Sequence, residues 1–86
     1  MPDVTIYTTP ICPYCQMAKG LFKRKGVAFA EIDVSGNAAL RSAMVEKAGG
    51  RRSVPQIFVG ATHVGGCDDL HDLEQQGGLD ALLALS

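Results

Sequence analysis

Hydrophobic residues recur along this chain with two periods, one typical of strands and one typical of helices. Runs rich in β-branched and aromatic residues, which favour strands, occur at Val4–Thr8, Val27–Asp33 and Val54–Val59. Thr62–Val64 follows the third run after the short turn Gly60–Ala61, and this spacing predicts a hairpin. The pattern therefore predicts four strands, the third of which begins at a proline.

The first predicted helix follows the first strand. Ala18, Leu21 and Phe22 lie at positions i, i+3 and i+4, which places them on one buried face of a helix. Pro13 suits the first turn of such a helix. Three basic residues, Lys23–Lys25, and then a glycine suit its C-terminal end, where positive charge is favourable. We interpret the basic residues as helix-capping residues on a solvent-exposed face.

Two further helices and a final short one are expected. The second is predicted over about Ala38 to Ala48, with the turn Ser35–Asn37 capping it. The third is predicted over about Asp68 to Gln76, between two Gly-Gly pairs. The residues expected to be buried in the second helix are Leu40, Met44, Val45 and Ala48. Those expected to be buried in the final helix are Leu79, Leu82, Leu83 and Leu85.

The order of these elements is β-α-β-α-β-β-α, followed by the small final helix. The first strand–helix–strand crossover should be right-handed and should make a parallel pair, whereas the hairpin adds antiparallel strands. We therefore expect an α/β protein with one four-stranded mixed sheet and helices on both faces. The 86 residues correspond to a single domain, residues 1–86.

The charge balance excludes some classes of partner. The chain has 8 Lys and Arg against 9 Asp and Glu, so its formal net charge is −1. A general binder of nucleic acid or of anionic membranes would carry a basic surplus. Trp is absent and aromatic residues make up 6%, too few for a surface that stacks bases. We expect neither a nucleic-acid nor a membrane partner.

The chain also lacks signals for export. No apolar run approaches the roughly 18–20 residues of a membrane span. The start, Met1–Asp3, has no basic segment followed by an apolar stretch, so no signal peptide is expected. Three cysteines are too few, and odd in number, for the disulfide framework of a small secreted protein. These observations favour a cytoplasmic protein whose cysteines serve chemistry.

The motif that carries this chemistry is Cys12-Pro13-Tyr14-Cys15, where the first strand ends and the first helix begins. Free N–H groups and the helix dipole favour an anion at a helix N-terminus, so Cys12 is expected to be a thiolate there. Cys15, one turn later, is placed to close a disulfide with Cys12. The thiolate is the attacking species in thiol–disulfide exchange.

Two other interpretations of these cysteines compete with redox chemistry. One is a pair of ordinary buried cysteines, which would not need to lie where a strand leads into a helix. The other is a zinc site made of Cys12, Cys15 and Cys67 with either His63 or His71. Zinc ligand pairs usually lie on turns that do not open a helix after a proline, whereas a lone C-x-x-C beside a βαβ unit favours redox chemistry. We expect no metal.

Four segments, in this order and spacing, resemble the dithiol class of glutaredoxins, and the small bacterial members most. They are Ile6–Thr8 leading to Cys12–Cys15, Ser53–Val59, Gly65–Leu70 and Gly77–Leu79. The resemblance covers essentially the whole chain. It implies a thioredoxin-like fold, with Cys12 as the nucleophile and Cys15 as the resolving thiol. It also implies glutathione as the reducing co-substrate.

The resemblance further implies a glutathione site. The residues it assigns are Tyr14, Arg41, Arg52, Val54, Pro55, Gly66, Cys67 and Asp68. The Val54–Pro55 bond is expected to be cis, and Val54 is expected to pair with the peptide backbone of glutathione, as in strand addition. The segment from Gly66 to Asp68 would hold the γ-glutamyl end at a helix N-terminus.

Some roles in that site stay open. Asp69 is expected either to assist Asp68 or only to cap the helix. The cation for the glycyl carboxylate is Arg41 or Arg52, and Arg51 is the weaker candidate. Cys67 is expected to contribute its backbone N–H more than its sulfur, although a third reactive thiol is an alternative.

The activity implied is glutathione-dependent reduction of protein–glutathione mixed disulfides and of protein disulfides. The expected partners are glutathione and glutathionylated or disulfide-containing proteins, with a ribonucleotide reductase as one example at the level of the family, and the chain is expected to be a monomer. One alternative is a thioredoxin-type reductase that glutathione does not supply. Another is a carrier of a [2Fe–2S] cluster that Cys12 and glutathione hold between two chains.

Overall fold

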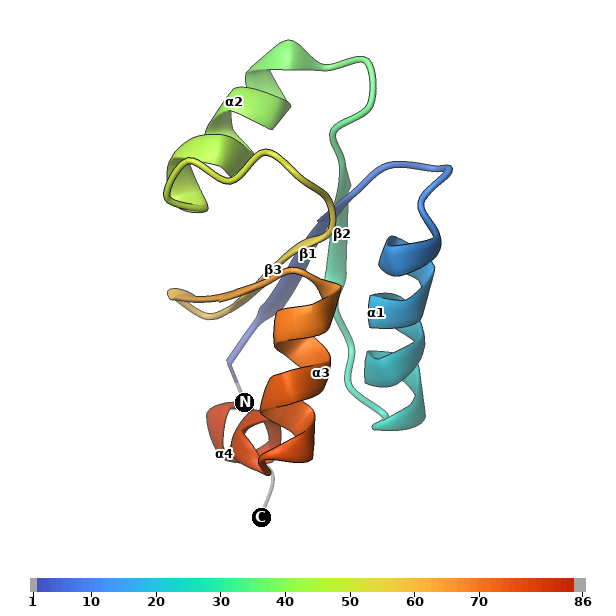
Figure 1. Ribbon diagram of the computed structural model, residues 1–86, viewed down its shortest axis with the longest axis vertical. Helices are drawn as coiled ribbons and strands as arrows, with labels where there is room; N and C mark the ends of the chain where they lie inside the picture. The colour runs from blue at the N-terminus through green and yellow to red at the C-terminus, as the bar shows by residue number, and fades with distance from the viewer. Residues whose placement is uncertain (1, 85–86) are drawn as a thin grey trace.

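The computed structural model describes residues 2–84, and the elements follow one another in the predicted order. The strands are β1 (Val4–Thr8), β2 (Ala30–Asp33), β3 (Gln56–Val59) and β4 (Thr62–Gly65). The helices are α1 (Pro13–Arg24), α2 (Ala38–Lys47), α3 (Cys67–Gln75) and the short α4 (Gly78–Leu82). Figure 1 shows α2 at one end of the molecule and α4 at the other.

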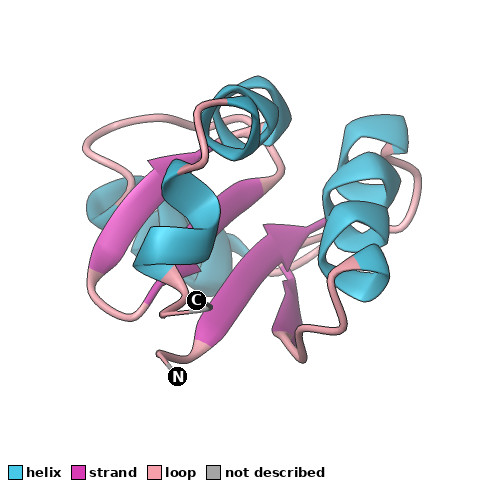
Figure 2. Cartoon of the chain, turned by 90° about the horizontal axis from the view of Figure 1, so that it is seen from below, coloured by secondary structure: helices cyan, strands magenta, loops and turns pink. Residues whose placement is uncertain are grey.

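The strands form one sheet in the order β2-β1-β3-β4. β1 pairs with β2 in parallel and with β3 in antiparallel orientation, and β3 pairs antiparallel with β4. The predicted four-stranded mixed sheet is therefore confirmed. Figure 2 shows the strands running through the middle of the molecule with the helices around them.

Side chains alternate between the two faces of the sheet, and each face has its own core. Ile6 and Ile57 face α1, α3 and α4, whereas Tyr7 and Phe58 face α2. The first core consists of Val4, Ile6, Ala18, Leu21, Phe22, Val27, Ile57, Val59, Leu70, Leu79 and Leu83. The second consists of Tyr7, Val34, Met44, Ala48 and Phe58. Helices thus cover both faces, as the sequence pattern predicts.

The strands β2 and β3 are both shorter than predicted. Val27 does not pair in the sheet, because its N–H donates to the carbonyl of Phe22 at the end of α1, and β2 starts at Ala30. β3 starts at Gln56 because the preceding Pro55 has no N–H to donate to the ladder.

The predicted burial of apolar residues in α2 is only partly correct. Leu40 was expected to be buried, but 37% of its surface is exposed. The reason is that the first turn of α2 lies beyond the end of the sheet (Figure 1), so only the stripe from Met44 to Ala48 contacts the core. Val45 is partly buried against that stripe. Leu85 lies outside the described residues.

The prediction that the basic residues Lys23–Lys25 at the end of α1 lie on a solvent-exposed face is wrong for Lys25. Its side chain is only 14% exposed, and its Nζ lies 2.8 Å from a carboxylate oxygen of Glu74 and 2.6 Å from one of Asp80. The hydrogen bond to Asp80 raises the pKa of Lys25 most, and the hydrogen bond to Glu74 raises it further. This cation therefore joins the end of α1 to α3 and α4.

Candidate active site

Three segments far apart in the sequence meet at one end of the strands of the sheet. Because β3 runs antiparallel to β1, the end of β1 lies beside the start of β3, with Tyr7 opposite Gln56. β4 runs antiparallel to β3 in turn, so Gly65 at the end of β4 lies opposite Ile57. The loop to α1, the loop before β3 and the start of α3 are thereby brought together.

Cys12 is the N-cap residue of α1. Its backbone is extended, with φ −149° and ψ 100°, and Pro13 occupies the first turn. The Cys12 sulfur accepts a hydrogen bond from the amide N–H of Cys15 over 3.1 Å. Such N–H groups and the helix dipole stabilise a sulfur anion at this position. The sulfur of Cys12 therefore lies at the N-terminus of α1 and takes part in capping it.

Cys15 lies beneath Cys12 in the protein interior. It has no exposed surface, against 9% for Cys12. Burial, and then its hydrogen bond with Cys12, raise the pKa of the Cys15 thiol to about 12. Both cysteines are free thiols in this structure. The pair is thus unequal: Cys12 keeps a small exposed surface, whereas Cys15 is fully enclosed and protonated.

The segment before β3 faces Cys12. The Val54–Pro55 peptide bond is cis, which confirms the expectation from the resemblance. The carbonyl oxygen of Val54 lies 3.8 Å from the Cys12 sulfur. Pro55 is buried and Val54 is half-buried. Backbone atoms of this segment therefore border the thiol.

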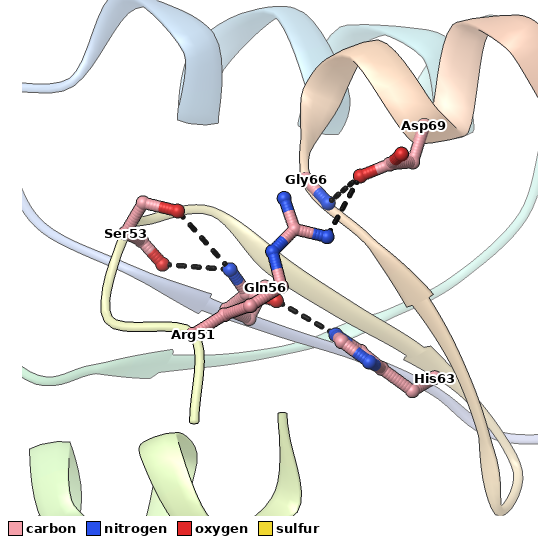
Figure 3. Close-up of polar contacts among 6 residues, drawn as sticks. All are labelled: Arg51, Ser53, Gln56, His63, Gly66 and Asp69. Atoms are coloured by element: carbon pink, nitrogen blue, oxygen red, sulfur yellow. Dashed lines mark hydrogen bonds and ion pairs between the residues drawn. The ribbon is translucent and has the colours of Figure 1, made fainter. Parts of the chain in front are cut away.

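The start of α3 forms the third side of the site. Gly66 is its N-cap, and Asp69 Oδ2 accepts hydrogen bonds from the Gly66 N–H and from Arg51 Nη1, each over 2.9 Å. Figure 3 shows both bonds. The hydrogen bond from the Gly66 N–H lowers the pKa of Asp69 most, and the hydrogen bond from Arg51 lowers it further. Of the two roles left open for Asp69, the structure shows the capping one, together with an ion pair to Arg51.

Gly65 is required where it stands for two reasons. Its φ of 117° is unfavourable for any residue with a side chain. A Cβ atom there would also come within 2.8 Å of Arg51 Nη1. The absence of a side chain lets Arg51 lie across the end of β4 and reach Asp69.

Cys67 is the first residue of α3 and is only 5% exposed. Burial, and then the charge of Asp68, raise the pKa of its thiol. Its sulfur lies 3.4 Å from Nδ1 of His71, one helical turn later. Cys67 therefore lines the site as a buried, neutral thiol with His71 beside its sulfur.

These segments enclose a shallow hollow of about 190 Å³. Its walls are Tyr14, Arg51, Ser53, Val54, Pro55, Gly66, Cys67, Asp68 and Asp69. They include every residue that the resemblance assigns to glutathione except Arg41 and Arg52. Asp68 is exposed at its rim.

Arg41 and Arg52 line a different hollow, of about 520 Å³, against α2. Arg41 Nη1 donates a hydrogen bond to the backbone carbonyl of Arg52 over 3.1 Å. The arginine beside the start of α3 is Arg51, the weaker candidate from the sequence. Nothing in the run Arg51-Arg52 reveals which side chain turns toward α3, because that depends on the pairing with Asp69.

Of the two histidines considered for a zinc site, His63 has its partner outside that set of residues, whereas His71 contacts one of its cysteines. His63 Nε2 lies 2.7 Å from Gln56 Oε1, and His71 lies against Cys67. Within residues 2–84, no group of three or more His, Cys, Asp or Glu side chains is arranged to hold a metal ion. Over the same residues, every helix is too short or too polar to cross a membrane.

Comparisons with known proteins agree with this geometry. The glutaredoxin family profile matches residues 4–64. A glutaredoxin of Pseudomonas aeruginosa is 60% identical over 84 residues, which cover 98% of this chain and 99% of that protein.

Solved structures show the same arrangement of elements. The solution structure of the glutaredoxin from Brucella melitensis matches with a TM-score of 0.86 and 56% identity, over 99% of this chain and 91% of that one. The crystal structure of a buckwheat glutaredoxin–glutathione complex matches with a TM-score of 0.87 and 28% identity, over 96% and 77% of the two chains. The chain therefore belongs to the glutaredoxin family: it has the thioredoxin-like fold and is a thiol–disulfide oxidoreductase, with a Cys12–Cys15 pair that fits a redox-active site.

Proposed function

We propose that this protein uses glutathione to reduce protein–glutathione mixed disulfides and protein disulfides. The observation that carries the proposal is the position of the Cys12 sulfur. It accepts a hydrogen bond from the Cys15 N–H in α1 and lies 3.8 Å from the carbonyl oxygen of Val54, which borders the hollow leading to the start of α3. A nucleophile and a surface suited to a short peptide are thereby adjacent.

The hollow offers complementary groups to the γ-glutamyl part of glutathione. Backbone N–H groups at the start of α3 suit its carboxylate, and the exposed carboxylate of Asp68 suits its ammonium group. The backbone of Val54 suits the peptide backbone of the tripeptide. The matching buckwheat structure is that of a glutaredoxin–glutathione complex, which supports this choice of ligand.

For the glycyl carboxylate we propose Arg41 and Arg52. Both line one hollow beside the loop that carries Val54, and the guanidinium of Arg51 is already paired with Asp69. Tyr14 borders the hollow near Cys12 and is 59% exposed, so its ring is available to cover the bound tripeptide. Pro55, Gly66 and Cys67 supply the buried walls of the site.

The one-cysteine route needs only Cys12. Its thiolate attacks the glutathione sulfur of a mixed disulfide, the protein thiolate leaves and takes up a proton, and Cys12 then carries the glutathionyl group. A second glutathione thiolate attacks that new bond, which releases oxidised glutathione and restores the Cys12 thiolate. One disulfide is exchanged for another, and two electrons pass to the protein substrate.

The two-cysteine route adds Cys15. Cys12 attacks a protein disulfide, and Cys15 then attacks the mixed disulfide, which frees the reduced protein and leaves a Cys12–Cys15 disulfide. Two glutathione molecules restore the dithiol. The hydrogen bond and charge of Cys12 are among the causes that raise the pKa of Cys15. Forming the mixed disulfide removes that charge, so Cys15 loses its proton more readily when it must react.

Exposed apolar side chains beside the nucleophile support a polypeptide substrate. Ile11 is 95% exposed, Tyr14 59% and Met17 51%. They lie at three-residue spacing from the loop into α1, next to Cys12. Single exposed apolar residues are common, but here they gather where a protein must dock. We propose that the chain acts as a monomer in the cytoplasm, where thiols are kept reduced.

The test compares Cys12→Ser with Cys15→Ser in a glutathione-coupled assay. Cys12→Ser should abolish turnover of every substrate. Cys15→Ser should keep deglutathionylation and lose reduction of protein disulfides. Loss of deglutathionylation in Cys15→Ser alone would reverse the roles of the two cysteines. If thioredoxin reductase, and not glutathione, sustained turnover of the unmodified protein, the proposed reductant would be wrong.

A further inference from the structure

A buried glutamine connects the edge strand β4 to the loop that faces Cys12. Gln56 has no exposed surface. Its Nε2 donates to the backbone carbonyl of Ser53 over 2.9 Å and to Ser53 Oγ over 3.3 Å. Its Oε1 lies 2.7 Å from Nε2 of His63 on β4. Figure 3 shows this chain of contacts running from His63 through Gln56 to Ser53.

The contacts fix which atom carries which proton. Both partners at Ser53 are oxygens, so the amide NH₂ of Gln56 must point there, and its carbonyl must point to His63. The ring atom that meets this carbonyl must be a donor, so Nε2 of His63 carries a hydrogen. Nε2 carries it in both the neutral and the charged imidazole, because the second proton binds at Nδ1.

The histidine ring is itself held in place. It stacks on Phe58, with the ring centroids 4.9 Å apart and an angle of 26° between the planes. Phe58 belongs to the core under α2. The donor is therefore anchored on the core, and the acceptor it meets belongs to a residue buried in the sheet.

We propose that His63 is a positioning residue for the segment Ser53–Pro55, acting through Gln56. Ser53 directly precedes Val54, whose carbonyl lies 3.8 Å from the Cys12 sulfur. Without the hydrogen bond from His63, the Gln56 amide is free to turn, and the hold on Ser53 is lost. The inference rests on the proposed function, because it assigns His63 to binding of the glutathionyl group rather than to the chemistry of the thiol.

The experiment measures kcat and KM for a glutathionylated test peptide, with His63→Phe, His63→Gln and His63→Asn. Phenylalanine can keep the stack on Phe58 but has no donor. The amide nitrogen of glutamine is as many bonds from Cβ as Nε2 of histidine, whereas that of asparagine matches Nδ1. Thr62→Val, at an exposed neighbouring position on β4, is the matched control.

We expect His63→Phe and His63→Asn to raise KM about three- to tenfold, the range that one net hydrogen bond supplies, with kcat within about twofold. His63→Gln should restore KM, and Thr62→Val should not change it. Gln56→Leu should raise KM as His63→Phe does, and combining the two should add nothing further.

Thermal unfolding separates positioning from general destabilisation. An unchanged KM in folded His63→Phe, or equal rescue by asparagine and glutamine, would overturn the inference. If His63→Phe does not fold, the comparison of His63→Gln with His63→Asn decides it. Failure of the proposed function is distinguishable, because the unmodified protein would then show no saturable glutathione-dependent turnover.

Discussion

The amide nitrogen of Cys15 donates a hydrogen bond to the sulfur of Cys12 over 3.1 Å. The backbone of the second cysteine thus stabilises negative charge on the first, while its own sulfur is fully buried. A C-x-x-C motif that opens a helix places these two groups together, because the N-cap side chain reaches the N–H three residues later. The asymmetry between the two thiols follows from this local geometry.

Alkylation should therefore discriminate between the two thiols. At neutral pH, iodoacetamide should modify Cys12 rapidly and leave Cys15 untouched, because Cys15 is buried and its pKa is raised to about 12. Peptide mass spectrometry of the reduced protein measures both rates. In Cys12→Ser, Cys15 should stay slow because burial persists. Comparable modification of both residues in the unmodified protein would contradict the asymmetry.

Stability should fall above pH 9. The pKa of Cys15 is raised from 9.0 to about 12 in the folded protein, so the folded state keeps a proton that the unfolded chain loses. The stability from this proton is complete below pH 9 and is lost as pH rises toward 12. Up to about 2 kcal/mol should disappear between pH 9 and 10.5. Urea unfolding under reducing conditions measures it, and Cys15→Ala should show a smaller decline.

Removing the Lys25 cation should loosen the end of α1 from α3 and α4. Lys25→Met should cost about 1 kcal/mol of unfolding free energy, since the ion pairs with Glu74 and Asp80 are only partly shielded from water. Lys23→Met is the control, because Lys23 is exposed and no ion pair is found for it within residues 2–84. Chemical unfolding at low and high salt should show the cost shrinking with salt. Equal effects of the two substitutions would contradict this role.

Ile11 should contribute to the turnover of protein substrates but not to the turnover of small disulfides. Ile11→Ser should lower kcat/KM for a disulfide-bonded protein substrate by about fivefold, because about 1 kcal/mol of apolar contact is lost. Turnover of bis(2-hydroxyethyl) disulfide should be unchanged. Leu40→Ser is the control, since Leu40 is also exposed but lies on α2. A similar loss for both disulfides would mean that Ile11 supports the site rather than docking.

Local patterns were sufficient for most of the fold. Pro13 and Asn37 mark the starts of α1 and α2 as expected, because capping depends on neighbouring residues. Leu40 was mispredicted because helical spacing does not tell how far a helix extends past the sheet beneath it. Lys25 was mispredicted because its carboxylate partners are 49 and 55 residues away. Such pairs are decided by tertiary packing.

The candidate site divides in the same way. The Cys12–Cys15 motif lies within one helical turn, so its geometry could be predicted from spacing. The choice of Arg51 as the partner of Asp69, and the contact of Gln56 with His63, depend on the register of β3 against β4. A glutamine in an otherwise apolar strand is the signal that was available, since a buried amide needs partners.

The three segments that meet at Cys12 lie at one end of the strands, and the turn of the β3–β4 hairpin lies at the opposite end. The hairpin turn at Gly60 and Ala61 lies there, exposed and next to the start of β1, where the Gly60 N–H meets the Asp3 carbonyl. A tether, label or short loop joined at Ala61 would point away from the reacting sulfur. The molecule is thus suited to immobilisation on an electrode or to fusion as a sensor component, with the active site facing the solution.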